Sequence, residues 1–230
     1  MKSINSNLTY KRRFSNLSIL VNYAFYFFFV IVFISFGLIE NKFFRITNLS
    51  TLLLQASTFM LLTTGVSFVI ISKDFDLSGG SVAFISASVG AYAIQQNWVP
   101  TFLGIVIIIL TGTLLGAING IIITKFKVPS FITTLGVMIG GRGLGLIIVG
   151  NKAHINIPIA LKDLSRMKIG PIYVEVIATI IIMIIAQVVL QATSFGKKIF
   201  AIGDNVKAAE LIGIDSKVIK LLLFTISGFF

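Results

Sequence analysis

The chain has 230 residues, of which 56% are hydrophobic and only 12% are charged, and its mean hydropathy is +1.00. A soluble domain of this length could not bury so much apolar surface, so a soluble enzyme or binding module is excluded, and the absence of cysteine excludes disulfides and thiol chemistry. The net charge of +11 does not indicate nucleic-acid binding, because no basic patch is interleaved with stacking aromatic residues.

Apolar runs recur along the chain, and each is about twenty residues long, enough to cross a hydrocarbon core of roughly 30 Å as a helix. We therefore predict an all-α fold, a polytopic transmembrane helical bundle. A basic cytoplasmic N-terminus (1–17) precedes one transmembrane domain (18–230). A signal peptide does not fit, because the first apolar stretch is too long and lacks a small-residue cleavage site. About six complete spans are predicted, at residues 19–39, 49–72, 78–95, 101–124, 129–150 and 171–191, with part of a seventh from Leu221.

Basic residues predict the orientation of these spans. If the spans alternate in direction, the N-terminus, the segment with Lys125 and Lys127, and the loop at residues 193–220 all lie on one side. Because lysine and arginine gather in cytoplasmic loops, we expect this side to be the cytoplasm. The predicted external loop at residues 151–170 also carries several basic residues and fits the rule less well.

Small and polar residues predict how the helices meet. Gly112, Gly116 and Gly120 recur at every fourth position of one span, a spacing that lets another helix backbone come close. A polar segment at residues 73–81 separates two spans, and Asp76 and Ser78 are expected to cap the helix that follows it.

The loop at residues 193–220 is a polar island that contains one predicted short helix, Val206 to Ile212. Asp204 or Asn205 can cap its first turn, and Gly213 can end it, because glycine adopts the left-handed conformation without steric cost. A helix of two turns is not stable alone. We therefore expect it to dock against something, although an ordinary surface helix would have the same spacing.

Several motifs in one order resemble the permeases of ABC sugar importers of the ribose, xylose, arabinose and autoinducer type. They are Phe195-Gly-Lys197, residues 201–205 (Ala-Ile-Gly-Asp-Asn) and residues 208–214, and before them residues 76–81, 116–120, 127–136 and Arg142-Gly143. The resemblance runs from about Asn48 to Phe230. It departs from the family at Asp74-Phe75 and at Gly79. The family also continues into a second half, so the resemblance implies a truncated chain, a frameshifted product or one half of a split permease.

The resemblance implies a transport subunit, not an enzyme, in the cell (inner or plasma) membrane, with several spans and a cytoplasmic N-terminus. Its expected partners are an ABC ATPase subunit, an extracytoplasmic sugar-binding protein, a second permease copy and membrane lipid, with no nucleic acid. No phosphate-binding loop is present, so no cofactor is expected in this chain, and ATP and Mg belong to the partner ATPase. The residues expected to couple to the ATPase are Gly203, Asp204, Asn205, Ala208, Ala209, Glu210, Gly213 and Ile214.

Polar side chains within the spans are candidates for a substrate pathway: Gln55, Asp76, Ser78, Asn119, Thr134 and Arg142. Each has a structural alternative, because polar groups in hydrocarbon also bond helix to helix, and an intramembrane arginine, which costs about 2.5–3.5 kcal/mol, can be satisfied by backbone carbonyls. No catalytic or metal site is expected, since His154 has no second histidine nearby. The resemblance implies a ribose-like monosaccharide as the substrate. A secondary transporter or channel, or a fragment without transport activity, stays as an alternative.

Overall fold

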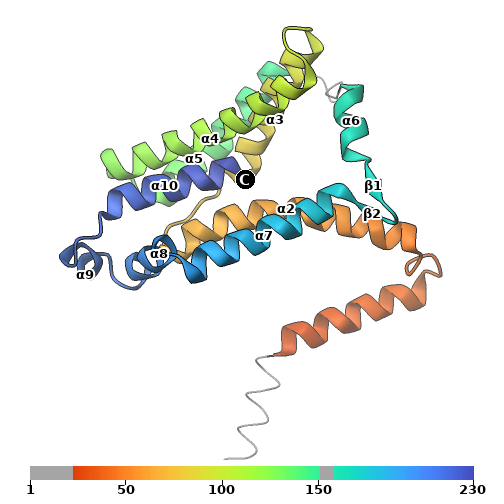
Figure 1. Cartoon of the computed structure of the whole chain (residues 1–230), viewed down its shortest axis with the longest axis horizontal. Coiled ribbons are helices and arrows are strands. Elements are labelled where there is room, and N and C mark those ends of the chain that lie inside the picture. The colour runs from red at the N-terminus through yellow and green to blue at the C-terminus, as the bar shows by residue number, and fades with distance from the viewer. Residues whose placement is uncertain (1–22, 151–157) are drawn as a thin grey trace, which may run out of the picture. The chain divides into compact units, whose positions relative to one another are not determined.

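The computed structural model describes residues 23–150 and 158–230 (Figure 1). The predicted N-terminal segment 1–17 and His154 lie outside the described residues. The chain divides into two compact units, the first ending at Leu52 and the second comprising Leu53–Phe230. In the first unit a helix at Tyr23–Ile39 is followed by a turn in which the side-chain amide of Asn48 donates a 2.8 Å hydrogen bond to the carbonyl of Phe43.

The predicted all-α fold is confirmed. Four helices are long and apolar enough to cross a membrane, and α3 and the helix Tyr23–Ile39 are somewhat shorter. All of them lie where apolar runs predicted them. The spanning helices are α2 (Ile46–Ile71), α4 (Thr101–Lys125), α5 (Ser130–Ile148) and α7 (Val174–Ala192), and α3 covers Gly79–Gln95.

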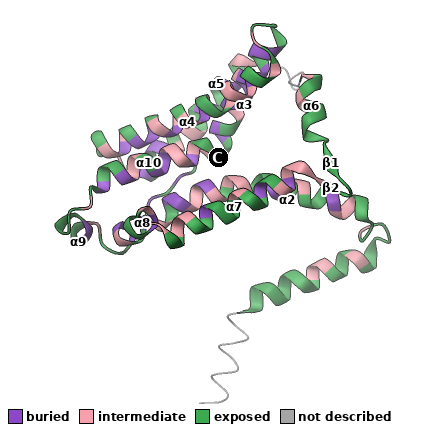
Figure 2. Cartoon of the chain, in the orientation of Figure 1, coloured by how far each residue is buried: buried purple, intermediate pink, exposed green. Residues whose placement is uncertain are grey.

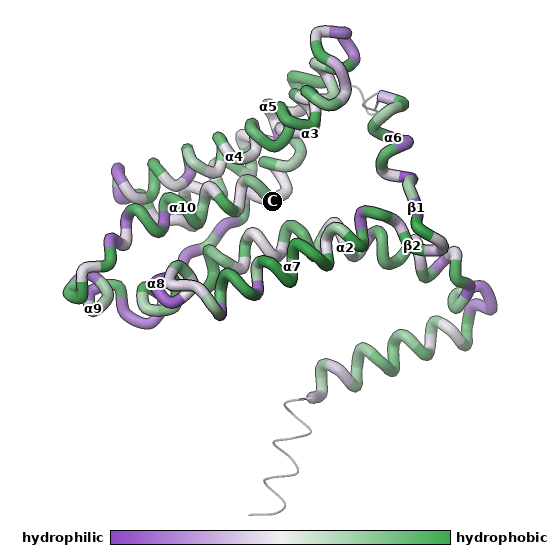
Figure 3. The backbone as a smooth tube through the Cα atoms, viewed as in Figure 1, coloured by the Kyte–Doolittle hydropathy of each residue, from purple (hydrophilic) through white to green (hydrophobic). Residues whose placement is uncertain are grey.

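Many residues of the long helices are exposed (Figure 2), and many residues along the same helices are hydrophobic (Figure 3). Only 17% of the most apolar window of α4 is buried within the chain, although that helix is among the most hydrophobic. Apolar side chains that face outward in this way fit contact with lipid. In lipid the backbone N–H and C=O groups must form their hydrogen bonds within each helix.

Short elements occupy the predicted external loop at residues 151–170 and also the first residues of the predicted span at 171–191, which begins as a helix only at Val174. Helix α6 (Ile159–Ser165) precedes strands β1 (Lys168–Ile169) and β2 (Ile172–Tyr173), which pair antiparallel with Lys168 opposite Tyr173. Between them Gly170 has φ +62°, and the ammonium group of Lys168 lies 4.1 Å from the centre of the Tyr173 ring. These strands are the only ones in the described residues, and they do not change the fold class.

Helix α10 (Ser216–Phe229) lies against α4, in contact with its glycine ridge (Figure 1). A Cβ atom added at Gly112 or Gly116 would collide with the backbone of Gly228 or Phe224. The ridge was predicted to accept a helix, and α10 is that helix. It begins at Ser216, five residues before the predicted start at Leu221, because Asp215 caps it by accepting hydrogen bonds from the first turn.

A buried apolar cluster gathers residues of six helices at one end of the second unit. Phe68 and Val69 at the end of α2 meet two side chains of α8 (Ser194–Asp204), and Leu223 and Phe224 of α10 complete the cluster. The segment that looked like a loop in the sequence is therefore built into the core. The α8 side chains are Ile199 and Ile202, and α9 (Val206–Leu211) contributes Ala209.

The prediction of a single short helix in residues 193–214 was wrong, because α8 precedes α9. The hydroxyl oxygen of Thr193 caps α8 by accepting a 3.2 Å hydrogen bond from the backbone N–H of Gly196. Phe195, Ile199 and Ile202 then follow at helical spacing and face the core. The capping threonine and the apolar spacing are both present in the sequence. The surrounding glycine and lysine residues are more typical of a loop, and they led to the prediction of a loop.

Candidate functional site

Helix α8 is attached to the ends of the two neighbouring spans by close backbone contact. A Cβ atom at Gly196 would collide with the Leu190 carbonyl of α7, and one at Gly203 with the Ile71 carbonyl of α2. The ammonium group of Lys73, just after α2, donates a 3.2 Å hydrogen bond to the backbone carbonyl of Asp204. The helix is thus held against the membrane bundle, and α9 projects from it.

Two residues that were predicted to bound α9, Asn205 and Gly213, lie at its two ends. The side-chain oxygen of Asn205 accepts a 3.2 Å hydrogen bond from the backbone N–H of Ala208, so Asn205 is the cap and Asp204 is not. Gly213 has φ +86°, in the left-handed region that ends a helix, two residues after Leu211.

Some of the predicted coupling residues are buried within the protein, and the others are exposed on its surface. Ala209, 2% exposed, and Gly203 are buried, and Ile214 is half-buried. The exposed members are Asp204, Asn205, Ala208, Glu210 and Gly213. The predicted set left out the two most exposed apolar side chains of the segment, Leu211 at 87% and Ile212 at 74%. Two adjacent apolar residues before a helix-ending glycine were the signal that could have found them.

A polar connector, residues 72–78, joins α2 to α3 and is buried at alternate positions. The residues Ser72, Asp74, Asp76 and Ser78, taken whole, are each at most 9% exposed. Asp74 forms an ion pair of 2.8 Å with Lys220 of α10. Lys73 adopts a positive φ of 62°, which lets the backbone turn out of α2.

Asp76 is the centre of a chain of hydrogen bonds within this connector. Its Oδ1 accepts from the backbone N–H and the hydroxyl of Ser78, at 2.9 and 2.6 Å, and its Oδ2 accepts from the hydroxyl of Ser227 at 2.6 Å. The hydroxyl oxygen of Ser78 in turn accepts from the side-chain amide of Asn119 on α4, at 2.9 Å. Asp76 therefore fixes the start of α3, as predicted, whereas the side chain of Ser78 makes no capping bond.

The backbone of the connector is bonded to α5. The hydroxyl of Ser130 accepts a 3.2 Å hydrogen bond from the N–H of Phe75, and the hydroxyl of Thr134 donates to the carbonyl of Phe75 at 3.3 Å. The single O–H of the fully buried Thr134 is shared between this carbonyl and the nearer carbonyl of Ser130, at 2.8 Å.

The structure thus brings together four of the six residues predicted for a substrate pathway. Asp76, Ser78, Asn119 and Thr134 all lie at the connector, and most of their hydrogen-bonding groups are used within the protein. The Oδ1 atom of Asn119, a residue 1% exposed, has no partner. Arg142 and Gln55 are not part of this cluster, because both are exposed on other stretches of α5 and α2.

A carboxylate that was not among the predicted site residues lies between α2 and α7. Oε1 of Glu175, in the first turn of α7, accepts a 3.1 Å hydrogen bond from the hydroxyl of Thr58 on α2. Within the described ranges 23–150 and 158–230, no three potential metal ligands gather into one site.

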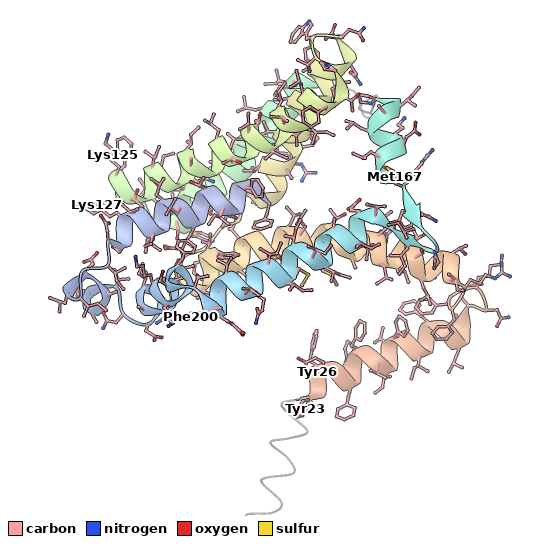
Figure 4. The ribbon with its side chains drawn as sticks, in the orientation of Figure 1. Tyr23, Tyr26, Lys125, Lys127, Met167 and Phe200 are labelled. Carbon is pink, nitrogen blue, oxygen red and sulfur yellow. The ribbon has the colours of Figure 1, made fainter. Side chains whose placement is uncertain are left out.

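Lys125 and Lys127 lie at the opposite end of the second unit from α6 and the hairpin β1–β2 (Figures 1 and 4). Lys125 and Lys127 follow α4 at the end where Phe200 of α8 also lies, and Met167 lies at the other end (Figure 4).

A family model described as the permease component of branched-chain amino acid transport systems matches residues 48–230. The chain is 34% identical over 200 residues to the ribose import permease protein RbsC of Haemophilus influenzae, covering 84% of this chain and 61% of that protein. It is 29% identical to the autoinducer 2 import system permease protein LsrC of Yersinia enterocolitica over 84% of this chain and 53% of that protein. It is 25% identical to LsrC of Salmonella typhi over 86% of this chain and 57% of that protein. The chain thus spans less than two thirds of these relatives, and no solved structure matches it.

Proposed function

Because the chain belongs to the family of permease components of branched-chain amino acid transport systems, we propose that it is the membrane subunit of an ATP-driven importer for a ribose-like monosaccharide. The substrate class rests on the relative named as a ribose import permease, which is 34% identical to this chain over 200 residues. The substrate would pass from an extracytoplasmic binding protein, through a pathway shared with a second permease copy, into the cytoplasm.

The observation that supports the ATP-driven mechanism is the exposed apolar tip of α9. Leu211 and Ile212 point away from the chain, while Ala209 of the same short helix is anchored in the core. A helix held rigidly on one side and apolar on the other fits a groove of a partner protein. We assign that groove to an ABC ATPase subunit, which would bind ATP with Mg²⁺ and hydrolyse it.

The proposed orientation places α8, α9 and the N-terminus in the cytoplasm of a cell whose inner or plasma membrane holds the spans. It is supported by the lysines that follow α4, Lys125 and Lys127, which share the α8 end of the bundle (Figure 4). The hairpin β1–β2 would then face the binding protein.

Co-purification tests the docking surface. An ABC ATPase subunit from the same organism is co-expressed with the full chain, and Leu211→Glu is compared with Leu164→Glu, which places the same charge on exposed α6. Loss of the ATPase with Leu211→Glu alone is expected, because the variant buries an unpaired carboxylate at the contact. Equal recovery of the ATPase with both variants would show that α9 is not the docking surface.

Uptake into vesicles tests the substrate class. Vesicles that contain the complex, ATP and the binding protein are offered labelled D-ribose and, in parallel, labelled L-leucine. ATP-dependent uptake of ribose but not leucine is expected. Uptake of leucine would assign the chain to amino acid transport, and uptake without ATP, driven by a proton or sodium gradient, would favour a secondary transporter.

A further inference from the structure

Helices α9 and α10 are joined by side-chain bonds as well as by the chain itself. The hydroxyl of Ser216, the first residue of α10, donates a short hydrogen bond to Oε1 of Glu210 in α9. Asp215 between them caps α10 by accepting from the backbone N–H groups of Lys217 and Val218, at 3.0 and 3.1 Å. A displacement of α9 therefore displaces the start of α10.

Helix α10 meets the polar connector at two points on one face. Lys220 pairs with Asp74 at 2.8 Å, and Ser227 donates to Asp76 at 2.6 Å. Because the two α10 residues are seven positions apart, about two helical turns, both contacts lie on the same side of α10. The connector thus follows any movement of α10 along its axis.

On its other side the connector is bonded to the helices of the α3–α5 bundle. Ser130 and Thr134 of α5 bond the backbone of Phe75, and Asn119 of α4 bonds Ser78 at the start of α3. The connector is therefore the one polar element, among the described residues, with side-chain bonds to α4, α5 and α10 together. Because the connector is bonded to α10 on one side and to α4 and α5 on the other, it can transmit a displacement of α10 to those helices.

We propose that the Asp74–Lys220 ion pair is a positioning contact that carries motion of α9, through α10 and the connector, into helices α3 to α5. The proposal rests on the proposed function, since the partner ATPase supplies the motion. The glycine contact between α4 and α10 holds the two helices together. It contains no pair of polar side chains that would align α10 with the connector. The ion pair is directional and only partly exposed, at 22% for Lys220 and 11% for Asp74, so it fixes the register of α10 against the connector.

The test compares variants of the complex in proteoliposomes with the binding protein and labelled D-ribose. The paired variant Asp74→Asn with Lys220→Gln removes both charges, so neither is left buried and unpaired. The reversed pair, Asp74→Lys with Lys220→Asp, restores the attraction. Lys217→Gln is the matched control, because Lys217 lies one turn earlier on α10, is exposed, and carries the same charge. The measured quantity is sugar transported per ATP hydrolysed.

The neutral pair is expected to lower this ratio about 2- to 30-fold, the range of coupling changes found for residues between two sites, while ATPase co-purification is unchanged. The reversed pair should recover most of the ratio, and Lys217→Gln should keep it. A purely structural role would instead lower the amount of folded complex and leave the ratio constant.

Two failures are distinguishable. If the unaltered complex transports ribose and the neutral pair keeps its transport-to-hydrolysis ratio, the positioning contact is refuted and the proposed function stands. If the unaltered chain neither recruits the ATPase nor transports, both the proposed function and the inference that rests on it are refuted.

Discussion

Gly116 of α4 lies so close to Phe224 of α10 that a methyl group at position 116 would overlap the Phe224 carbonyl oxygen. Gly116→Ala should therefore force α10 away from α4, with an expected loss of about 1–3 kcal/mol in the free energy of unfolding. Thermal unfolding of the purified chain in detergent micelles measures the effect.

The control for this variant is Gly140→Ala on α5, where an added Cβ atom would meet nothing within 4 Å. This variant should unfold at the temperature of the unaltered chain or above it, because alanine favours a helix over glycine. Equal destabilisation by both alanines would mean that α10 does not rest on the α4 glycines.

The hydrogen bond from the Ser227 hydroxyl to the Asp76 carboxylate is expected to stabilise the fold. Ser227→Ala leaves Oδ2 of a side chain only 9% exposed without its donor, at an expected cost of about 1–3 kcal/mol in the free energy of unfolding. Thr225→Ala is the matched variant, since its hydroxyl bonds only the Leu221 carbonyl of its own helix. Denaturation of both in detergent should show the larger loss for Ser227→Ala, and the opposite order would contradict the network.

The cap of α9 can be tested apart from any partner. Asn205→Ala removes the acceptor for the Ala208 N–H and should cost about 0.5–2 kcal/mol of local helix stability. Hydrogen exchange of the amides in residues 206–211 should speed up accordingly. Asp204→Ala should leave that exchange unchanged, because the Asp204 side chain caps nothing and its backbone carbonyl is retained. Equal exchange in both variants would assign the cap to another group.

The sequence predicted the spans well, because length and apolarity are local properties. The run predicted at residues 101–124 is α4, Thr101–Lys125, and that predicted at 78–95 is α3, Gly79–Gln95. The limits of α9 were also predictable, since Asn205 and Gly213 act on their immediate neighbours. The glycine spacing on α4 predicted a close helix but could not say that α10 would be that helix.

The contacts that organise the connector could not be predicted from the sequence. Asp76 and Ser227 are 151 positions apart, and one sequence holds no record of which distant side chains meet. From the sequence alone Asp74 is only a departure from the family motif, yet it pairs with Lys220. Helix α8 was missed for a different reason, because its glycines and lysines outweighed the Thr193 cap and the apolar spacing.

The link between Asp76 and Ser227 also bears on how the protein is made. At about 5–20 residues per second, the ribosome needs roughly 8 to 30 seconds to synthesise the 151 positions that separate carboxylate from hydroxyl. During that time the newly inserted α2 and α3 carry an acidic group whose final donor does not yet exist. We expect water, or an insertion factor, to solvate this group until α10 is made, so this corner completes its hydrogen bonds only after α10 has been inserted.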